Sequence, residues 1–274
     1  MTSINTNYAA MLAAQNLNAT TTGLNTVQTR IATGLKVSSA KDNGAIYGIA
    51  LRQQATSQSL NAVRESLQRT QSVVDVSLAA GETITDLLVQ LKEKALAAVD
   101  GSLSASDRSS LNTDFNALKN QITNASTVSG FNGTSLISST SGFIRALASD
   151  TGTQFISISQ QPLNLGGTNV TVAVGTSLGS AALASTALSL VNASINSVAL
   201  ALSNLGTGAK ALENHTIFIN KLQDAVDNGV GNIIDADMAK EASKLQSMQA
   251  KQQLGFQALS IANQGPSNLL GLFR

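Results

Sequence analysis

Residues 44–98 read GAIYGIALRQQATSQSLNAVRESLQRTQSVVDVSLAAGETITDLLVQLKEKALAA, a proline-free stretch in which apolar residues recur every seven positions. Two such tracks run three residues apart: Ile46, Leu60, Leu67, Val74, Leu88, Ala95, and Ile49, Val63, Ile84, Leu91, Ala98. A 3.5-residue repeat held this long predicts a helix with a coiled-coil seam. At about 1.5 Å per residue, this helix would form a rod of about 80 Å.

A second stretch of the same kind lies near the other end of the chain. From Leu188 to Ile233 apolar positions alternate by three and four, so we expect a long helix that packs antiparallel against residues 44–98. Near Gly229, Gly231 and Ile233–Ile234 the pattern shifts by one residue, which predicts a joint between two coiled-coil segments. In an antiparallel pair this joint would face the polar connector 35–44.

The part between the two rods changes in kind. Ser104 and Asp107 resemble a capping box, which predicts the start of a third helix that ends before a tight turn at 130–133. The segments 143–148, 154–159 and 169–174 are short and rich in β-prone residues. We therefore expect a mainly α protein of long antiparallel coiled-coil rods, with a small β-hairpin region in mid-sequence.

The two ends are almost free of charge. Residues 1–40 contain no Asp or Glu, and residues 252–273 contain no charged side chain. Both ends still have helical spacing, at Ala10, Leu17, Leu24 and Ile31, and at Leu245, Met248, Gly255, Leu259 and Ala262. Because a solvated helix normally carries charge on its outer face, these ends are predicted to be assembly surfaces that lack a partner in the lone chain. Pro266 is expected to end the last helix.

Composition excludes several classes of function. Only 12% of residues are charged, the net charge is +1 and no basic patch suggests nucleic acid. There is no cysteine, hence no disulfide or thiolate metal site. No basic and apolar leader opens the chain, so we expect no Sec-type signal peptide, and neither end has the run of about 18 apolar residues that membrane insertion needs.

One string has the form of a catalytic motif. Residues 175–179 match G-x-S-x-G, follow a β-prone stretch and precede a helix, which would make Ser177 the nucleophile of a hydrolase. The chain has one histidine, His215, but Glu213 stands two residues from it on one helix, where side chains do not face each other. The hydrolase is therefore a remote alternative, and we expect no enzyme, cofactor or metal site.

Two weaker strings also favour ordinary helix surface. Residues 206–210 resemble a phosphate-binding loop only loosely, because they lack the G-x-x-x-x-G-K spacing. Asp224, Asp227, Asp235 and Asp237 have no calcium-loop spacing.

The ends carry a family resemblance. Residues 3–7 (SINTN), 14–18 (AQNLN), 30–36 (RIATGLK) and 39–43 (SAKDN) resemble the N-terminal signature of bacterial flagellins. Residues 235–241 (DADMAKE), 252–255 (QQLG) and 262–270 (ANQGPSNLL) resemble its C-terminal signature. The chain is similar to a short flagellin without large outer domains.

The resemblance implies a structural subunit that polymerises into the extracellular flagellar filament for motility. It implies an inner helical domain of residues 1–34 and 237–274, connectors at 35–44 and 229–236, a helical rod of 45–140 and 184–228, and a β-rich, Ser/Thr-rich outer part at 141–183. A hook–filament junction protein, which shares the terminal pattern, is the alternative. The expected assembly contacts are Ile4, Leu12, Leu17, Leu24, Ile31, Met238, Leu245, Met248, Leu254, Leu259, Leu269 and Leu270.

The resemblance also implies partners and modification. The expected partners are other copies of the chain, sister flagellins, the flagellar export apparatus, a secretion chaperone, and the filament cap and hook-junction proteins. Flagellins are often O-glycosylated, and the candidates by composition are Ser138, Ser139, Thr140, Ser141, Thr151, Thr153, Thr168, Thr171, Thr176 and Ser177.

Overall fold

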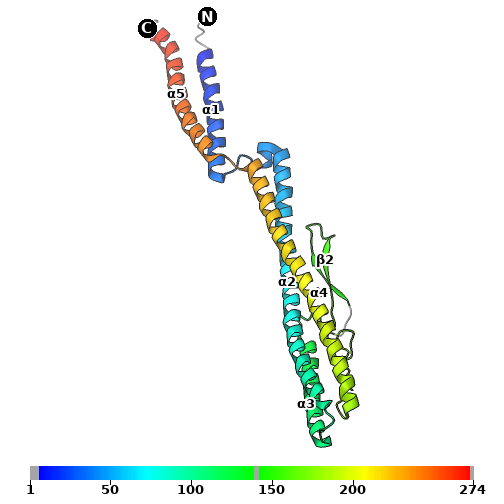
Figure 1. Ribbon diagram of the computed structural model, residues 1–274. Helices are drawn as coiled ribbons and strands as arrows, with labels where there is room; N and C mark the ends of the chain where they lie inside the picture. Colours follow the sequence, from blue (N-terminus) through cyan, green and yellow to red (C-terminus); the bar gives the residue numbers. More distant parts are fainter. Residues whose placement is uncertain (1–5, 139–141, 272–274) are drawn as a thin grey trace. The chain divides into compact units, whose positions relative to one another are not determined.

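The computed structural model describes residues 6–138 and 142–271, which form five helices and one two-stranded sheet (Figure 1). The chain divides into two compact units. The terminal unit comprises Met1–Ala55 and Asp224–Arg274, and the rod unit comprises Thr56–Gln223. The long helices α2 (Ala40–Ala98) and α4 (Ala181–Ile234) each contribute to both units, which are described separately below.

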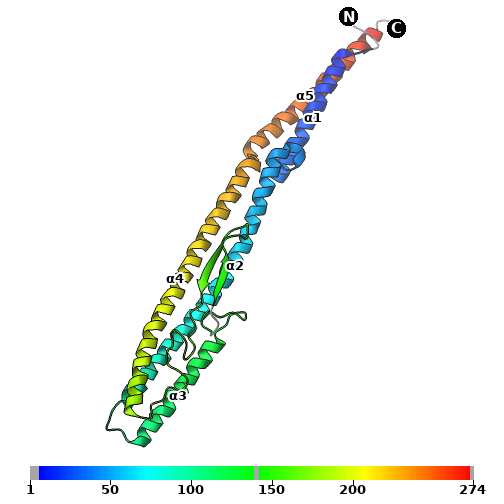
Figure 2. The ribbon, with the colours of Figure 1, turned by 90° about the vertical axis from the view of Figure 1, so that its right-hand side faces the viewer.

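In the rod unit, α2 and α4 run antiparallel side by side in both views (Figures 1 and 2). The predicted seven-residue tracks form its core, because Leu67, Val74 and Leu88 are fully buried, as are Val198 and Leu205 from α4. The mainly α, coiled-coil-like fold is therefore confirmed. Ile49, on the second track, is exposed, so the prediction was wrong for that residue.

Helix α3 (Ala105–Val128) covers this pair and starts as predicted. The Ser104 side chain accepts a hydrogen bond from the amide of Asp107 and caps the helix. Phe115 and Ile122 are fully buried against the α2 and α4 core. After α3, the Phe131 amide donates to Thr134 O and the Thr134 amide to Phe131 O, which closes the predicted turn.

The β region is a single hairpin. Strands β1 (Phe143–Leu147) and β2 (Phe155–Ser159) pair antiparallel, with Arg145 opposite Ser157. Ala146 and Ile158 turn inward and join the helix core. The opposite face of the hairpin points to solvent, as the strand periodicity of two requires.

The predicted third strand at 169–174 was wrong. Apart from a bridge between Leu165 and Val170, this segment packs on α4 instead of joining the hairpin. The Thr171 amide donates to Ser194 Oγ at 2.9 Å, and the Thr171 hydroxyl donates to Leu190 O at 3.1 Å. The Ser194 side chain thus accepts the backbone hydrogen bond that a neighbouring strand would have accepted, and the Thr171 hydroxyl adds a second bond to the helix.

The terminal unit pairs α1 (Tyr8–Thr33) with α5 (Met238–Gly271) and joins them to the ends of α2 and α4 through two short connectors. The connectors pair with each other, since the Lys36 amide donates to Ile234 O at 2.6 Å and the Ala236 amide to Gly34 O at 2.8 Å. Gly34 has the positive φ of 72° that ends α1 in a left-handed cap.

Helix α4 continues through Gly229 and Gly231 and ends at Ile234, which places the joint at 235–237, at the end of the stretch where the register shift predicts it. One helix end was predicted wrongly. Helix α5 continues through Pro266 to Gly271. A proline inside a helix removes one backbone hydrogen bond. Here the side chain of Asn7, the residue that caps α1, donates to the carbonyl oxygen that Pro266 leaves without a donor, as described below.

Among the described helices, α4 is long and apolar enough to span a membrane by length and composition alone. Many of its apolar side chains, including Val191 and Leu212, are buried in the rod core. The core of a coiled-coil rod accounts for this composition without a membrane.

Candidate assembly surface

The surface of α1 satisfies its polar groups within the helix. Six threonine hydroxyls donate to the carbonyl oxygen four residues earlier, at 2.8–3.0 Å; they belong to Thr20, Thr21, Thr22, Thr26, Thr29 and Thr33. A hydroxyl bonded to its own helix demands little from water or from a neighbour. The residues that lack charge therefore build a helix face suited to close packing.

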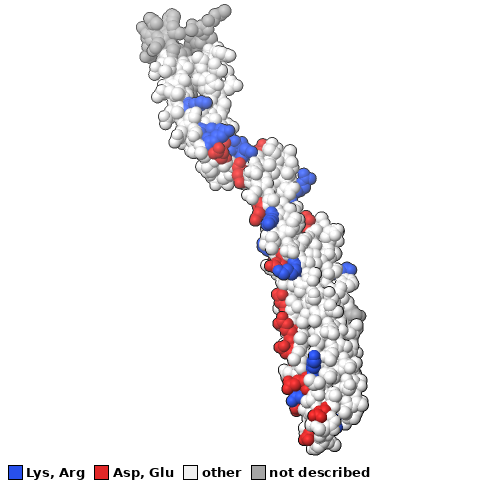
Figure 3. Space-filling model, in the orientation of Figure 1, with Lys and Arg blue, Asp and Glu red and all other residues white. Residues whose placement is uncertain are grey.

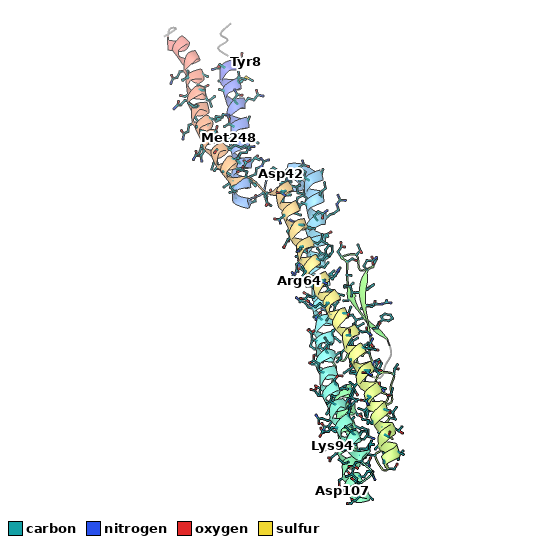
Figure 4. The ribbon with its side chains drawn as sticks, in the orientation of Figure 1. Tyr8, Asp42, Arg64, Lys94, Asp107 and Met248 are labelled. Atoms are coloured by element: carbon teal, nitrogen blue, oxygen red, sulfur yellow. The ribbon has the colours of Figure 1, made fainter. Side chains whose placement is uncertain are left out.

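Glycines let α1 and α5 approach each other closely. A Cβ on Gly255 would lie 3.1 Å from Leu17 Cδ1, and a Cβ on Gly23 would lie 3.0 Å from Met248 Cε (Figure 4). Leu24 and Val27 are the two α1 side chains that this pairing buries. The expectation that both ends lack a partner in the lone chain was therefore wrong for one face, because α5 covers it.

Asn7 joins the start of α1 to α5 with both ends of its amide. Its Oδ1 accepts the Ala10 amide hydrogen at 3.0 Å as the helix cap, and its Nδ2 donates to Ala262 O at 2.7 Å. Ala262 O would normally accept from the amide of residue 266, which is a proline without an amide hydrogen. The carbonyl oxygen of Ala262, which Pro266 leaves without its helical donor, is thus the acceptor that fixes the start of α1 against α5.

A charged cluster closes the other end of this pair. Glu241 is buried, and its Oε1 lies 2.7 Å from Lys244 Nζ and 3.7 Å from Arg30 Nη1. Burial of a carboxylate is costly unless it is paired, and the two cations pair Oε1, whereas Oε2 and Arg30 Nε are buried without a hydrogen-bond partner among the described residues. Arg30 is one of only two charged residues in the first forty, and the structure shows that it pairs across the helices.

The predicted assembly residues divide between the two sides of the α1 and α5 pair. Leu24 is buried, and Leu17, Ile31, Leu245, Met248 and Leu259 are half-buried. Leu12, Met238 and Leu254 are exposed. Leu269 and Leu270 lie in the last turns of α5, and Ile4 lies outside the described residues. Their role in assembly stays a prediction.

Periodicity alone missed much of the exposed apolar surface. Tyr8, Met11, Phe256 and Ile261 are 56–78% exposed and lie off the seven-residue tracks. Together with Leu12 and Leu254 they form what we call the terminal apolar surface. Part of it lines an open groove with Ala9, Ala13, Asn16, Gly255, Ala258 and Ala262. The signal in the sequence was large apolar residues within the two charge-free stretches, at positions that the partner helix does not use.

Figure 3 shows the contrast in charge, since few Lys, Arg, Asp or Glu side chains appear over the described outer parts of α1 and α5. Exposed apolar side chains that line a common groove, as Leu12, Leu254 and Ile261 do here, are typical of a binding surface. The arrangement can bind another apolar helix and offers no group for covalent chemistry.

The catalytic-looking string does not form an active site. Residues 175–179 follow a turn instead of a strand, so the strand–turn–helix geometry of a nucleophile elbow is absent from this described segment. Lys119 donates to Val174 O at 2.6 Å and Thr176 O at 2.5 Å, which fixes the turn. His215 Nε2 lies 2.8 Å from Ala148 O, where it ties α4 to the loop after β1.

Of the two weaker strings, the first is helical, and the second is divided between α4, which contains Asp224 and Asp227, and the joint at 235–237, which contains Asp235 and Asp237. Residues 206–210 lie inside α4, and no metal-binding group of three His, Cys, Asp or Glu side chains occurs in the described parts of the chain.

The candidate glycosylation sites differ in accessibility. Thr151, Thr153 and Thr168 are exposed, whereas Ser138, Thr171, Thr176 and Ser177 are half-buried. Thr171 uses its hydroxyl to bond α4. Ser139, Thr140 and Ser141 lie outside the described residues.

Known proteins resemble this chain along its whole length. The profile of the bacterial flagellin N-terminal helical region matches residues 4–141, and that of the C-terminal helical region matches residues 188–273. Flagellin FljO of Caulobacter vibrioides is 50% identical over 100% of this chain and 99% of its own length. A flagellin of Brucella melitensis is 31% identical over the full length of both chains. A crystal structure of Bacillus cereus flagellin, 19% identical over 66% of this chain and 94% of its own, aligns with a TM-score of 0.41.

Proposed function

Since the chain belongs to the bacterial flagellin family, whose members are structural subunits of the extracellular flagellar filament, we propose that the terminal apolar surface holds its subunits together. In this proposal residues 1–34 and 237–274 form the inner layer of the filament. The rod, at 45–140 and 184–228, with its β-rich part at 141–183, lies outside that layer.

The observation that carries the proposal is the exposure of large apolar side chains on both terminal helices. Tyr8 is 78% exposed, Met11 66% and Ile261 69%, and the stretches in which they lie, residues 1–29 and 252–273, contain no charged side chain. Burial of such side chains is worth about 1.5–3 kcal/mol each. Neighbouring copies that cover them would gain this energy many times along a filament.

The test is polymerisation of purified chain, followed by light scattering and electron microscopy. Leu12→Asp combined with Leu254→Asp would place unpaired carboxylates in the covered surface, so we expect no filaments at concentrations where the unaltered chain polymerises. Circular dichroism should show the same helix content for both monomers.

The matched control is Val128→Asp, which alters an 81% exposed valine in the rod unit and should leave filaments. Normal filaments from the doubly altered chain would contradict the proposal. Deletion of residues 253–274 should likewise give a soluble rod that does not polymerise.

The finer partners are also part of the proposal. Several sister flagellins occur in Caulobacter, and chains this similar are expected to coassemble. Delivery through the flagellar export apparatus with a chaperone, and placement beneath a cap, are consistent with an unfolded chain that carries no cysteine. The relatives described above are named flagellins, which favours the filament over the hook–filament junction.

Sugar attachment, if present, is proposed at Thr151, Thr153 or Thr168, whose side chains are exposed. An intact mass of 28.1 kDa for the chain from its native cell would refute this proposal.

A further inference from the structure

The solvent face of the hairpin carries one isolated cation. Arg145 is the only Lys or Arg between Lys119 and Lys210. Its guanidinium lies 4.5 Å from the ring centre of Phe143 and 5.8 Å from that of Phe155. Both rings are themselves about half exposed, at 54% and 45%. The structure therefore presents a charged group that two aromatic rings hold in place on an open surface.

The donors of this guanidinium have no acceptor in the described parts of the chain. Among the described residues, Arg145 makes no salt bridge and donates no side-chain hydrogen bond. A planar guanidinium with free donors fits a carboxylate, which it can bind with two parallel hydrogen bonds. An exposed Phe–Arg–Phe surface thus calls for an acidic partner with apolar side chains beside it.

The rod unit carries a surface of that description on α2. Asp75, Glu82, Asp86 and Glu93 are exposed and spaced by seven, four and seven residues, so they form one straight row along the helix. The row extends for about 27 Å. Within the described chain none of the four forms a salt bridge.

Exposed apolar residues flank this acidic row. Val89 follows Asp86 by three residues and is 52% exposed, and Leu96 follows Glu93 by three and is 58% exposed. Residues three apart are neighbours on a helix surface. Like the hairpin, the acidic row therefore has ionised groups beside apolar ones. Its charge is negative, whereas that of the hairpin is positive.

The two surfaces lie on different sides of the rod unit. Figure 3 shows acidic side chains along the edge that α2 forms, whereas the hairpin lies on the other side of α4 in the same orientation. One chain cannot bring them together, but two copies can. Contacts between two different surfaces of identical subunits generate rings, or helical filaments where the rotation does not close.

We propose that Arg145 of one copy, with Phe143 and Phe155 around it, docks on the acidic row of α2 in a second copy, near Glu82 and Asp86. This inference rests on the proposed function, since it names one subunit contact of the filament. The covered rings would exclude water from the ion pair, which strengthens it relative to an exposed pair.

Critical concentration for polymerisation is the measured quantity. Arg145→Glu would place like charges together, so we expect a critical concentration about tenfold higher than that of the unaltered chain. Glu82→Lys with Asp86→Lys should raise it similarly. Combining all three substitutions restores opposite charges, and the critical concentration should return most of the way to its original value.

The control Lys221→Glu makes the same change in net charge as Arg145→Glu, but at an exposed lysine elsewhere in the rod unit. It should have little effect on the critical concentration. Circular dichroism of each monomer checks the fold, and Arg145→Gln replaces Arg145→Glu if the hairpin does not tolerate the acid.

If Arg145→Glu polymerises like the unaltered chain, or the triple variant recovers nothing, the docking is wrong although the filament function stands. If the unaltered chain itself does not polymerise, the proposed function fails first.

Discussion

The rod unit and the terminal unit are built from the same kind of helix, yet they differ in what they bury. In the rod unit, whole heptad tracks are inaccessible, with Leu67, Val74 and Leu205 at 0% exposure. In the terminal unit, α1 buries only Leu24 and Val27. The difference lies in the third layer, because α3 and the hairpin cover the rod helices while nothing described covers the outer face of α1 and α5.

The comparison shows that the spacing of apolar residues predicts which helices pair. The number of packed layers decides how much of each helix surface is buried. Two helices bury one stripe each, and a wider apolar stripe needs a further element. The rod unit supplies that element from its own chain. In our proposal, the terminal unit obtains it from neighbouring copies.

The largest expected effect is loss of the rod core. Phe115→Ala removes a fully buried ring of α3 and should lower the free energy of unfolding by about 3–5 kcal/mol. Leu12→Ala, at an exposed position of the terminal unit, should change it by less than about 0.5 kcal/mol. Urea unfolding of the monomer measures both, and similar losses for the two variants would erase the comparison.

The buried lysine is expected to come next. The Lys119 side chain is 3% exposed. Lys119→Met keeps a side chain of similar length but leaves Val174 O and Thr176 O without their donor. Hydrogen bonds from a charged donor contribute about 1.5–3 kcal/mol to stability. Thermal unfolding should therefore shift down by several degrees, while Lys221→Met, at an exposed lysine, should leave it unchanged.

Lys119 shows where prediction from the sequence stopped. Leu118 and Ile122 predicted a buried stripe on α3, but a lysine beside it reads as solvated face, and only the turn at 174–176 reveals why it is inside. Its pKa is lowered by the loss of hydration on burial. The partner carbonyls lie more than fifty residues away, beyond any local pattern.

Long-range hydrogen bonds explain the other errors as well. The segment 169–174 has strand propensity, but Ser194 takes its hydrogen bond. Pro266 carries a stop signal, but Asn7 takes the free acceptor. The tracks and caps were predictable because their determinants are local, as Ser104 with Asp107 shows. The lack of charge predicted where the terminal apolar surface lies in the chain. It did not predict all of the residues that form this surface.

Asn7→Ala should have a smaller effect, confined to the terminal unit. The variant loses the cap on α1 and the bond to Ala262 O, which together should cost about 1–2 kcal/mol locally. Hydrogen exchange of the first α1 turn should accelerate, while rod-unit amides stay unchanged. Asn18→Ala, at an exposed asparagine, is the control.

A second substitution separates the two roles of Asn7. Pro266→Ala restores an amide donor for Ala262 O, so Asn7→Ala in that background should lose only the cap. Equal effects of Asn7→Ala in both backgrounds would show that the bond to Ala262 contributes nothing.

The smallest expected effect is a pH dependence at one aspartate in each unit. Asp42 Oδ2 accepts from the amides and hydroxyls of Ser38 and Ser39, and these bonds, Ser38 first, hold its pKa below the ordinary 3.8. Asp100 has a pKa lowered in the same way by Ser102. The folded carboxyls hold protons less tightly than unfolded ones, so their contribution is complete above pH 3.8 and is lost as pH falls through the lower folded values.

The two aspartates should nevertheless respond differently to acid. In the rod unit the loop at Asp100 keeps a second support, because Arg108 donates to Asp100 O at 2.7 Å and to Ala98 O at 3.2 Å, and carbonyl oxygens do not titrate in this range. In the terminal unit, protonation of Asp42 removes the acceptor of the whole Ser38–Ser39 turn. Amide exchange below pH 3.8 should therefore accelerate at Ser38 and Ser39 relative to Ser102, and Arg108→Gln should bring Ser102 to the same behaviour. Equal acceleration at both sites in the unaltered chain would mean that the terminal unit is no more loosely held at its connector than the rod unit is at its loop.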